Sequence, residues 1–126
     1  MTRPGSLAEV ARRSATRREL GYALPEFLDE FAAHPDPSSL TQEPELLRDR
    51  FEGGEVGDAY LAAVAVTLAR SIGTAPPPWV WKDRRKLREP WFAHPGAALR
   101  ATLLLESPAA FRERNLFVSH NALSRA

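Results

Sequence analysis

The sequence predicts an all-α fold, an irregular bundle of about five helices with one long connection rich in proline and tryptophan. Three observations support this fold class. Apolar residues recur at helical spacing in several segments, residues suited to capping stand at the ends of these segments, and no segment of strand length alternates between apolar and polar residues. A length of 126 residues indicates one helical domain, which we expect to cover residues 1–126.

The first expected helix begins after Ser6. This serine is a suitable N-cap, and Glu9 stands three residues later, as in a capping box. Residues 1–18 also hold five arginines against one acid. We therefore expect this stretch to form either the first helix or a flexible basic N-terminal arm.

Apolar spacing predicts two further helices before the middle of the chain. The apolar positions of the first of them are Leu20, Leu24, Phe27, Leu28 and Phe31. Pro25 fits the first turn of a helix that runs to Ala33, or a kink within a longer helix. The second is a short helix around residues 46–51, which Gly53 and Gly54 would end.

The segment "GDAYLAAVAVTLARSIG" carries the strongest helical pattern. Asp58 can cap its start, Arg70 suits the negative C-terminal turn, and Gly73 can adopt the left-handed conformation past its end. The residues from Tyr60 to Leu68 are apolar nearly all round. We therefore expect the central, most buried helix here.

A connection of about twenty residues, "TAPPPWVWKDRRKLREPWF", follows this helix. Its three consecutive prolines impose an extended conformation, and connections of this length are often functional. A final helical hairpin is expected after it. One helix covers residues 97–104, and a second opens at Ser107 and Pro108 and runs through Phe111 to about Arg114.

The composition excludes several kinds of chemistry. The chain has no cysteine, which rules out disulfides, thiol chemistry and most structural zinc schemes. Its three histidines lack metal-type spacing, so we expect no metal and no cofactor. The start lacks the apolar core of a secretory signal, and the longest apolar run is too short to span a bilayer. We expect a soluble cytoplasmic protein with no membrane partner.

All three tryptophans lie in the long connection, interleaved with basic residues. Aromatic side chains beside arginine are typical of binding hot spots. Two other interpretations stay open: the tryptophans could pack into the core, or they could stack on nucleotide bases while the cations bind phosphate. For a protein partner, the expected contact residues here and in the C-terminal segment are Trp79, Trp81, Arg84, Arg85, Trp91, Phe92, Arg112, Arg114 and Phe117.

The C-terminal segment "RNLFVSH" resembles the short Arg-polar-x4-His motif of HEPN ribonucleases, which are small helical-bundle proteins. The resemblance implies metal-independent RNA cleavage across a homodimer, with Arg114, Asn115 and His120 as catalytic candidates. Residues six apart on one continuous helix point about 120° away from each other, so their convergence would need a break. In the other interpretation, the intervening "LFV" anchors the tail in the core.

A wider resemblance covers about residues 20–126. The segments "PEFLDEF", "DAYLAAVAVTLAR", "WVWKDRRKLREPWF" and "ESPAAFRERNLFV…NALSRA" are similar to a family of small uncharacterised bacterial proteins. Members of that family are often encoded beside nucleotidyltransferase-fold proteins, in an arrangement like a toxin–antitoxin pair. The resemblance implies a nucleotidyltransferase-like partner. It implies no activity, and His120 is not a fixed part of the family's pattern.

Together these observations favour a non-enzymatic protein-interaction module, the antitoxin-like or accessory partner of a nucleotidyltransferase-type protein. The alternative is a metal-independent HEPN-type ribonuclease that uses Arg114 and His120. DNA binding through the N-terminal arginines is a third hypothesis. It is opposed by the net charge of only +1 and by residues 19–58, which hold eleven acids against two arginines. The sequence leaves the oligomeric state open.

Overall fold

The computed structural model describes residues 2–94 and 96–123; residues 124–126, the end of the "NALSRA" segment, lie outside this part of the chain. The α-helices of the described part are α1 (Leu7–Arg12), α2 (Arg17–Ala33), α3 (Gly54–Ser71), α4 (Ala97–Glu106) and α5 (Ala109–Arg112). Its other elements are the 3-10 turns η1 (Pro37–Leu40), η2 (Pro78–Trp81) and η3 (Asp83–Arg85) and the strands β1 (Trp91–Phe92) and β2 (Leu116–Phe117).

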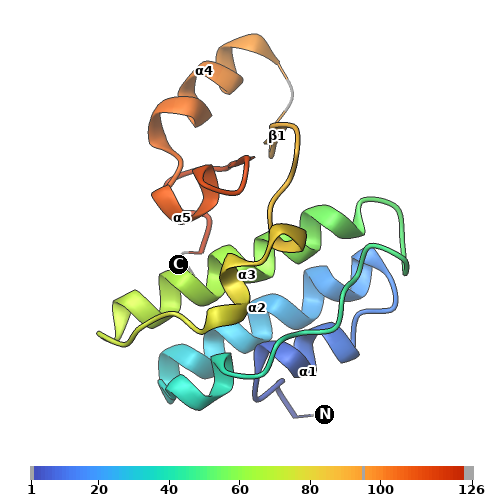
Figure 1. The fold of residues 1–126 in the computed structure, drawn as a ribbon, viewed down its shortest axis with the longest axis vertical. Helices are drawn as coiled ribbons and strands as arrows, with labels where there is room; N and C mark the ends of the chain where they lie inside the picture. Colours follow the sequence, from blue (N-terminus) through green and yellow to red (C-terminus); the bar gives the residue numbers. More distant parts are fainter. Residues whose placement is uncertain (1, 95, 124–126) are drawn as a thin grey trace.

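Helix α3 is the centre of the fold. It contacts η2, η3, α5 and β2, and every residue from Leu61 to Val66 is fully buried. Gly73, just past its end, has a φ of +74°, so the predicted central helix and its C-terminal glycine are confirmed. Figure 1 shows α1, α2 and α3 lying close together and α4 at the opposite end of the molecule. The fold is mostly helical, as expected, but α4 stands apart from the other long helices, so the predicted bundle is not confirmed.

The first two helices begin at side-chain caps. The Ser6 hydroxyl accepts the Glu9 N–H at 3.0 Å, which confirms the predicted start of α1. Residues 7–12 therefore form the first helix, one of the two predicted alternatives, and not part of a flexible arm. The Thr16 hydroxyl caps α2 in the same way, by accepting the Glu19 N–H at 3.2 Å. Helix α2 then runs without interruption through Pro25, so the longer of the two predicted helices is the one that forms.

The prediction of a short helix around residues 46–51 is wrong. The chain there forms turns, and α3 begins at Gly54 rather than at Asp58. The reason is that the Leu47 N–H donates to the buried Asp58 carboxylate at 2.6 Å, while the Leu47 carbonyl accepts a turn hydrogen bond from Arg50. Asp58 therefore does not cap α3; it holds the preceding segment against the helix.

The sequence predicted no strand, but β1 and β2 form a short parallel pair. Trp91 lies opposite Leu116, and Phe92 lies opposite Phe117. Asn115 has a φ of +61°, which turns the chain after α5 so that residues 116–117 run beside the long connection. The Trp91 N–H donates to the Asn115 carbonyl at 2.8 Å. This pairing ties the end of the connection to the C-terminal segment.

The junction of α4 and α5 also differs from the expected one. Ser107 ends α4, and Pro108 precedes the first residue of α5, which ends at Arg112. The Ser107 hydroxyl lies 2.5 Å from the Leu103 carbonyl and accepts the Val118 N–H at 2.9 Å. Leu116 and Val118 are both buried, so the segment after α5 is anchored in the core.

Candidate interaction surface

A buried arginine holds the Trp-rich connection on α3. Arg85 has no exposed side-chain surface, and its guanidinium donates to Glu43 Oε2 at 3.0 Å and to the Pro44 carbonyl at 2.5 Å. It also donates to the Asp58 carbonyl at 3.3 Å and lies 4.9 Å from the centroid of the Trp79 ring. The Trp79 indole is buried as well. These contacts fix η2 and η3 in one position on the helix.

Asp58 is the fully buried anion of this arrangement. Its carboxylate accepts the Leu47 N–H and a hydrogen bond from Arg48 Nε at 3.1 Å, and it lies 3.7 Å from Arg85 Nη1. Burial lowers the pKa of Arg85, and the neighbouring Glu43 and Asp58 carboxylates oppose that shift. Two buried charges of opposite sign therefore stabilise each other at the base of the connection.

Glu43 joins three cations of the connection to the acidic half of the chain. Its carboxylate accepts hydrogen bonds from Lys82 Nζ at 2.6 Å, from Arg84 Nη2 at 3.0 Å and from Arg85 Nη2 at 3.0 Å. Partial burial raises the pKa of Glu43, but the hydrogen bonds from Arg84, Lys82 and Arg85 outweigh burial and lower the pKa from 4.5 to about 2.

The depressed pKa of Glu43 predicts a specific acid sensitivity. Because the folded pKa lies below the unfolded value of 4.5, Glu43 stabilises the fold above that pH and loses this effect as the pH falls toward 2. We expect Glu43→Gln to lower the free energy of unfolding at neutral pH by on the order of 1–3 kcal/mol, allowing for solvent screening. Urea denaturation at a series of pH values measures this. A difference from the wild type that does not shrink below pH 4.5 would contradict the prediction.

Arg114 is a second buried arginine. Its Nη1 donates to the Ala110 carbonyl at 2.7 Å, and its Nη2 donates to the Val80 carbonyl at 2.9 Å. The guanidinium lies 5.4 Å from the centroid of the Trp81 ring. Burial lowers the pKa of Arg114, and Glu113 opposes that shift. Arg114 therefore joins α5 to η2 and supports one face of Trp81 from inside the protein.

The three residues of the ribonuclease-like motif face different surroundings. Arg114 points into the interior, and the Asn115 side-chain amide donates to the Leu87 carbonyl at 2.8 Å. The His120 side chain is 70% exposed, and its Nδ1 lies 3.6 Å from Glu106 Oε2. Arg114 and Asn115 therefore make structural hydrogen bonds. Within this chain, their side chains do not converge with that of His120 on one phosphate-binding site.

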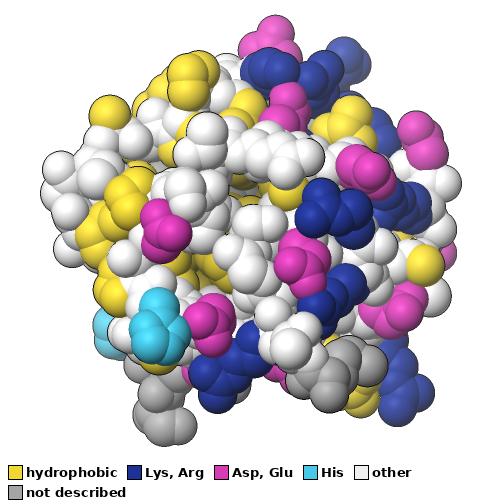
Figure 2. All heavy atoms as spheres, turned by 90° about the horizontal axis from the view of Figure 1, so that it is seen from below, with side chains coloured by type: hydrophobic (Ala, Val, Ile, Leu, Met, Phe, Trp, Pro, Cys, Tyr) yellow, Lys and Arg dark blue, Asp and Glu magenta, His cyan; other side chains and the backbone are white. Residues whose placement is uncertain are grey.

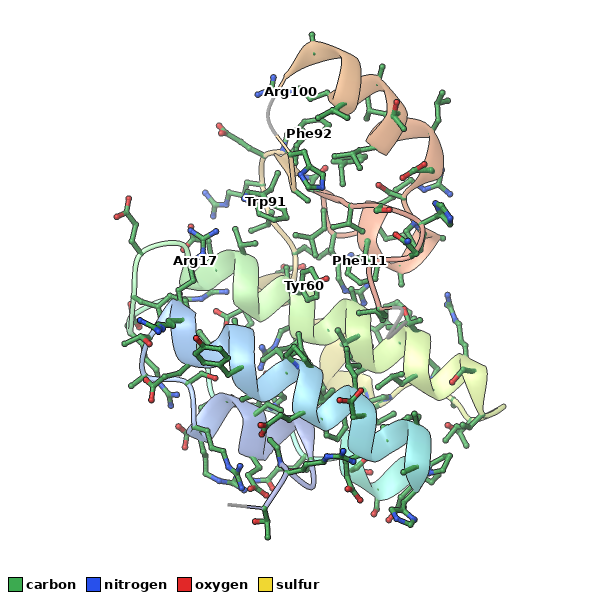
Figure 3. All side chains as sticks on the ribbon, turned by 180° about the vertical axis from the view of Figure 1, so that it is seen from behind. Arg17, Tyr60, Trp91, Phe92, Arg100 and Phe111 are labelled. Atoms are coloured by element: carbon green, nitrogen blue, oxygen red, sulfur yellow. The ribbon has the colours of Figure 1, made fainter. Side chains whose placement is uncertain are left out.

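The expected partner-contact residues fall into three groups in the structure. Trp79, Arg85 and Arg114 are buried, so the structure places them in the core and not on a contact surface. Trp91, Phe92 and Phe117 are half-buried; the rings of Phe92 and Phe117 stack with centroids 5.0 Å apart. Figure 3 shows Trp91 and Phe92 on the connection, below α4, which carries Arg100. The exposed members are Trp81, Arg84 and Arg112.

Charges of both signs line the open side of the connection. A polar cleft of about 830 Å³ lies between the connection and the start of α3. Its charged lining residues are Arg48, Glu55, Asp83, Arg84, Lys86, Arg88 and Glu89. On another face, Figure 2 shows Lys and Arg side chains interspersed with Asp and Glu and not gathered in one patch. Neither surface offers the single-sign field that favours a polyanion.

Glu43 and Asp58 organise this region, although the sequence pattern did not predict these roles for them. The available signal was the contrast between the acidic band of residues 19–58 and the basic run of residues 82–88, because such bands pair with each other or with a charged partner. Among residues 2–94 and 96–123, no three carboxylate or imidazole groups converge as a metal site would require. No helix in the same part of the chain is long and apolar enough to cross a membrane.

Comparison with known proteins adds no relative to this description. No protein-family model, curated protein or solved structure matches the chain. The two resemblances inferred from the sequence therefore remain predictions, and the function proposed below rests on the geometry of the connection.

Proposed function

We propose that this chain is a non-enzymatic, cytoplasmic protein-interaction module with Trp81 at the centre of its contact surface. The observation that carries the proposal is the position of Trp81, which is 47% exposed although it belongs to a firmly held turn. Buried Arg114 supports its ring, and the neighbouring Trp79 indole donates to the Leu40 carbonyl at 3.0 Å. A large aromatic side chain held in place before binding loses little conformational entropy in a complex.

The charges around Trp81 favour a protein over a nucleic acid as the partner. Glu43 already pairs with Lys82 and Arg84, which weakens their attraction for phosphate. Lys86 and Arg88 form no ion pair with the described residues, but they share their cleft with acidic side chains. Nucleic-acid binding needs a run of unpaired cations, whereas a protein surface can complement mixed charges.

The partner that we propose is a nucleotidyltransferase-like protein, for which this chain would serve as the antitoxin-like or accessory component. Its support is the sequence resemblance described above, together with an exposed tryptophan beside charged residues of both signs. The ribonuclease alternative gains no support from the geometry. Arg114 is buried and bonded to two backbone carbonyls, which leaves its guanidinium no open face for a phosphate.

Trp81→Ala tests the proposal against a matched exposed aromatic. We expect this variant to bind the nucleotidyltransferase-like partner at least about ten-fold more weakly in isothermal titration calorimetry, because an anchoring tryptophan supplies much of an interface's energy. Tyr22→Ala is the control, since Tyr22 is 61% exposed on α2, away from the connection. It should bind like the wild type.

Circular dichroism should show unchanged helix content in both variants. Equal binding by the wild type and Trp81→Ala would remove Trp81 from the interface. Equal weakening by Trp81→Ala and Tyr22→Ala would show that exposed aromatics contribute without regard to position, and the proposed surface would then be wrong.

A further inference from the structure

A second candidate site lies away from Trp81, between the first half of α2, the start of α3 and β1. It is a pocket of about 300 Å³. The apolar side chains of its lining are Leu20, Leu24, Pro25, Phe51, Val56 and Trp91. A concave, mostly apolar space of this size is at the small end of the range for ligand pockets.

Two polar side chains border this apolar space. Arg17 is the one charged residue in the lining that the structure describes, and it forms no ion pair with the described residues. Tyr60 is half-buried, and its ring packs edge-on against Phe111 with centroids 5.1 Å apart. Burial raises the pKa of the Tyr60 hydroxyl, which therefore stays protonated and can donate a hydrogen bond. Figure 3 shows Arg17, Tyr60 and Trp91, which come from α2, α3 and β1.

Gly21 leaves the backbone of α2 open to this space. It lies in the interior of α2 and in the pocket lining, where glycine is less favourable than alanine. A Cβ at this position would meet no atom within 4 Å. A ligand in the pocket could therefore lie directly against the helix backbone at Gly21.

We propose that this pocket binds a small monocarboxylate with an apolar body. Arg17 binds the carboxylate, and the apolar body lies against Gly21, Trp91 and the Tyr60 ring. The charge of the lining determines the ligand class: a single unpaired cation at an apolar pocket complements one negative charge. A neutral hydrocarbon would leave Arg17 unused, and a larger anion would exceed the space.

Octanoate is a suitable probe, and calorimetric titration of the full chain is the measurement. We expect saturable binding at millimolar or lower concentration, and at least ten-fold weaker binding of octanol, which has the same chain without the charge. Arg17→Gln should weaken octanoate binding at least ten-fold. Arg12→Gln is the matched control, because Arg12 is an exposed arginine of α1 outside the pocket, and it should bind octanoate like the wild type.

Gly21→Ala separates the ligand site from a structural role. The added methyl group suits the helix, so the melting temperature without ligand should rise by about 3–5 °C, while octanoate binding should weaken at least ten-fold. The proposal is overturned by absence of octanoate binding, by equal binding of octanoate and octanol, or by wild-type affinity in either Arg17→Gln or Gly21→Ala. If octanoate only partitions onto the protein surface, octanoate and octanol should bind equally. If the pocket accepts only a partner's side chain, octanoate should not bind.

Discussion

Replacement of Arg85 with methionine is expected to lower the free energy of unfolding by about 3–5 kcal/mol. Methionine keeps much of the side-chain volume but removes the charge, which leaves the buried Asp58 carboxylate without one of its cations and the Pro44 carbonyl without a donor. The loss is a large part of the stability of an ordinary domain. Urea denaturation followed by far-UV circular dichroism measures this loss. Partial unfolding of the variant at room temperature would also agree with the prediction.

Arg84→Met is the matched control, because Arg84 is the preceding residue and binds the same Glu43 carboxylate. Its side chain is 43% exposed, so solvent screens its charge and the variant should lose far less stability than Arg85→Met. Two losses of similar size would show that burial does not distinguish the adjacent arginines. The arrangement around Arg85 would then not be what holds the connection on α3.

Helices α1 and α3 could be predicted because local signals determine them. The Ser6 cap, the apolar run of α3 and the glycine that follows it depend on neighbouring residues in the sequence. The turn at residues 46–51 could not be predicted in this way. Its Leu47 N–H bonds to Asp58, eleven residues away, and this tertiary contact overrides a weak helical pattern.

The candidate site was harder to predict than the fold, because residues of one type take opposite roles. Arg84 and Arg85 are the adjacent arginines of "KDRRKLR", yet Arg84 faces solvent and Arg85 is fully buried. Likewise Trp79 packs in the core, two residues before the exposed Trp81. The way the 3-10 turns lie on α3 determines which side chain is buried, and no local pattern in the sequence predicts that arrangement.

Two glycines that look alike in the sequence have different surroundings in the fold. The N-terminal half of α3 and the turn before it touch at Gly54, where a Cβ would overlap the Leu47 carbonyl group and lie 2.8 Å from Arg48 Cα. At Gly57, one turn later, a Cβ would lie 3.0 Å from Leu47 Cδ1 and 3.2 Å from Leu20 Cδ2. Backbone atoms cannot yield, whereas the ends of leucine side chains can.

We therefore expect Gly54→Ala to lower the free energy of unfolding by more than about 3 kcal/mol, since the turn carrying Leu47 must move away from α3 and lose its bond to Asp58. Gly57→Ala should change stability by less than about 1 kcal/mol, because the helical preference for alanine offsets a small shift of the leucines. Urea denaturation of both variants gives the comparison. If Gly54→Ala is as stable as Gly57→Ala, the close approach of the turn to α3 is not required, and Asp58 must hold that turn from a greater distance.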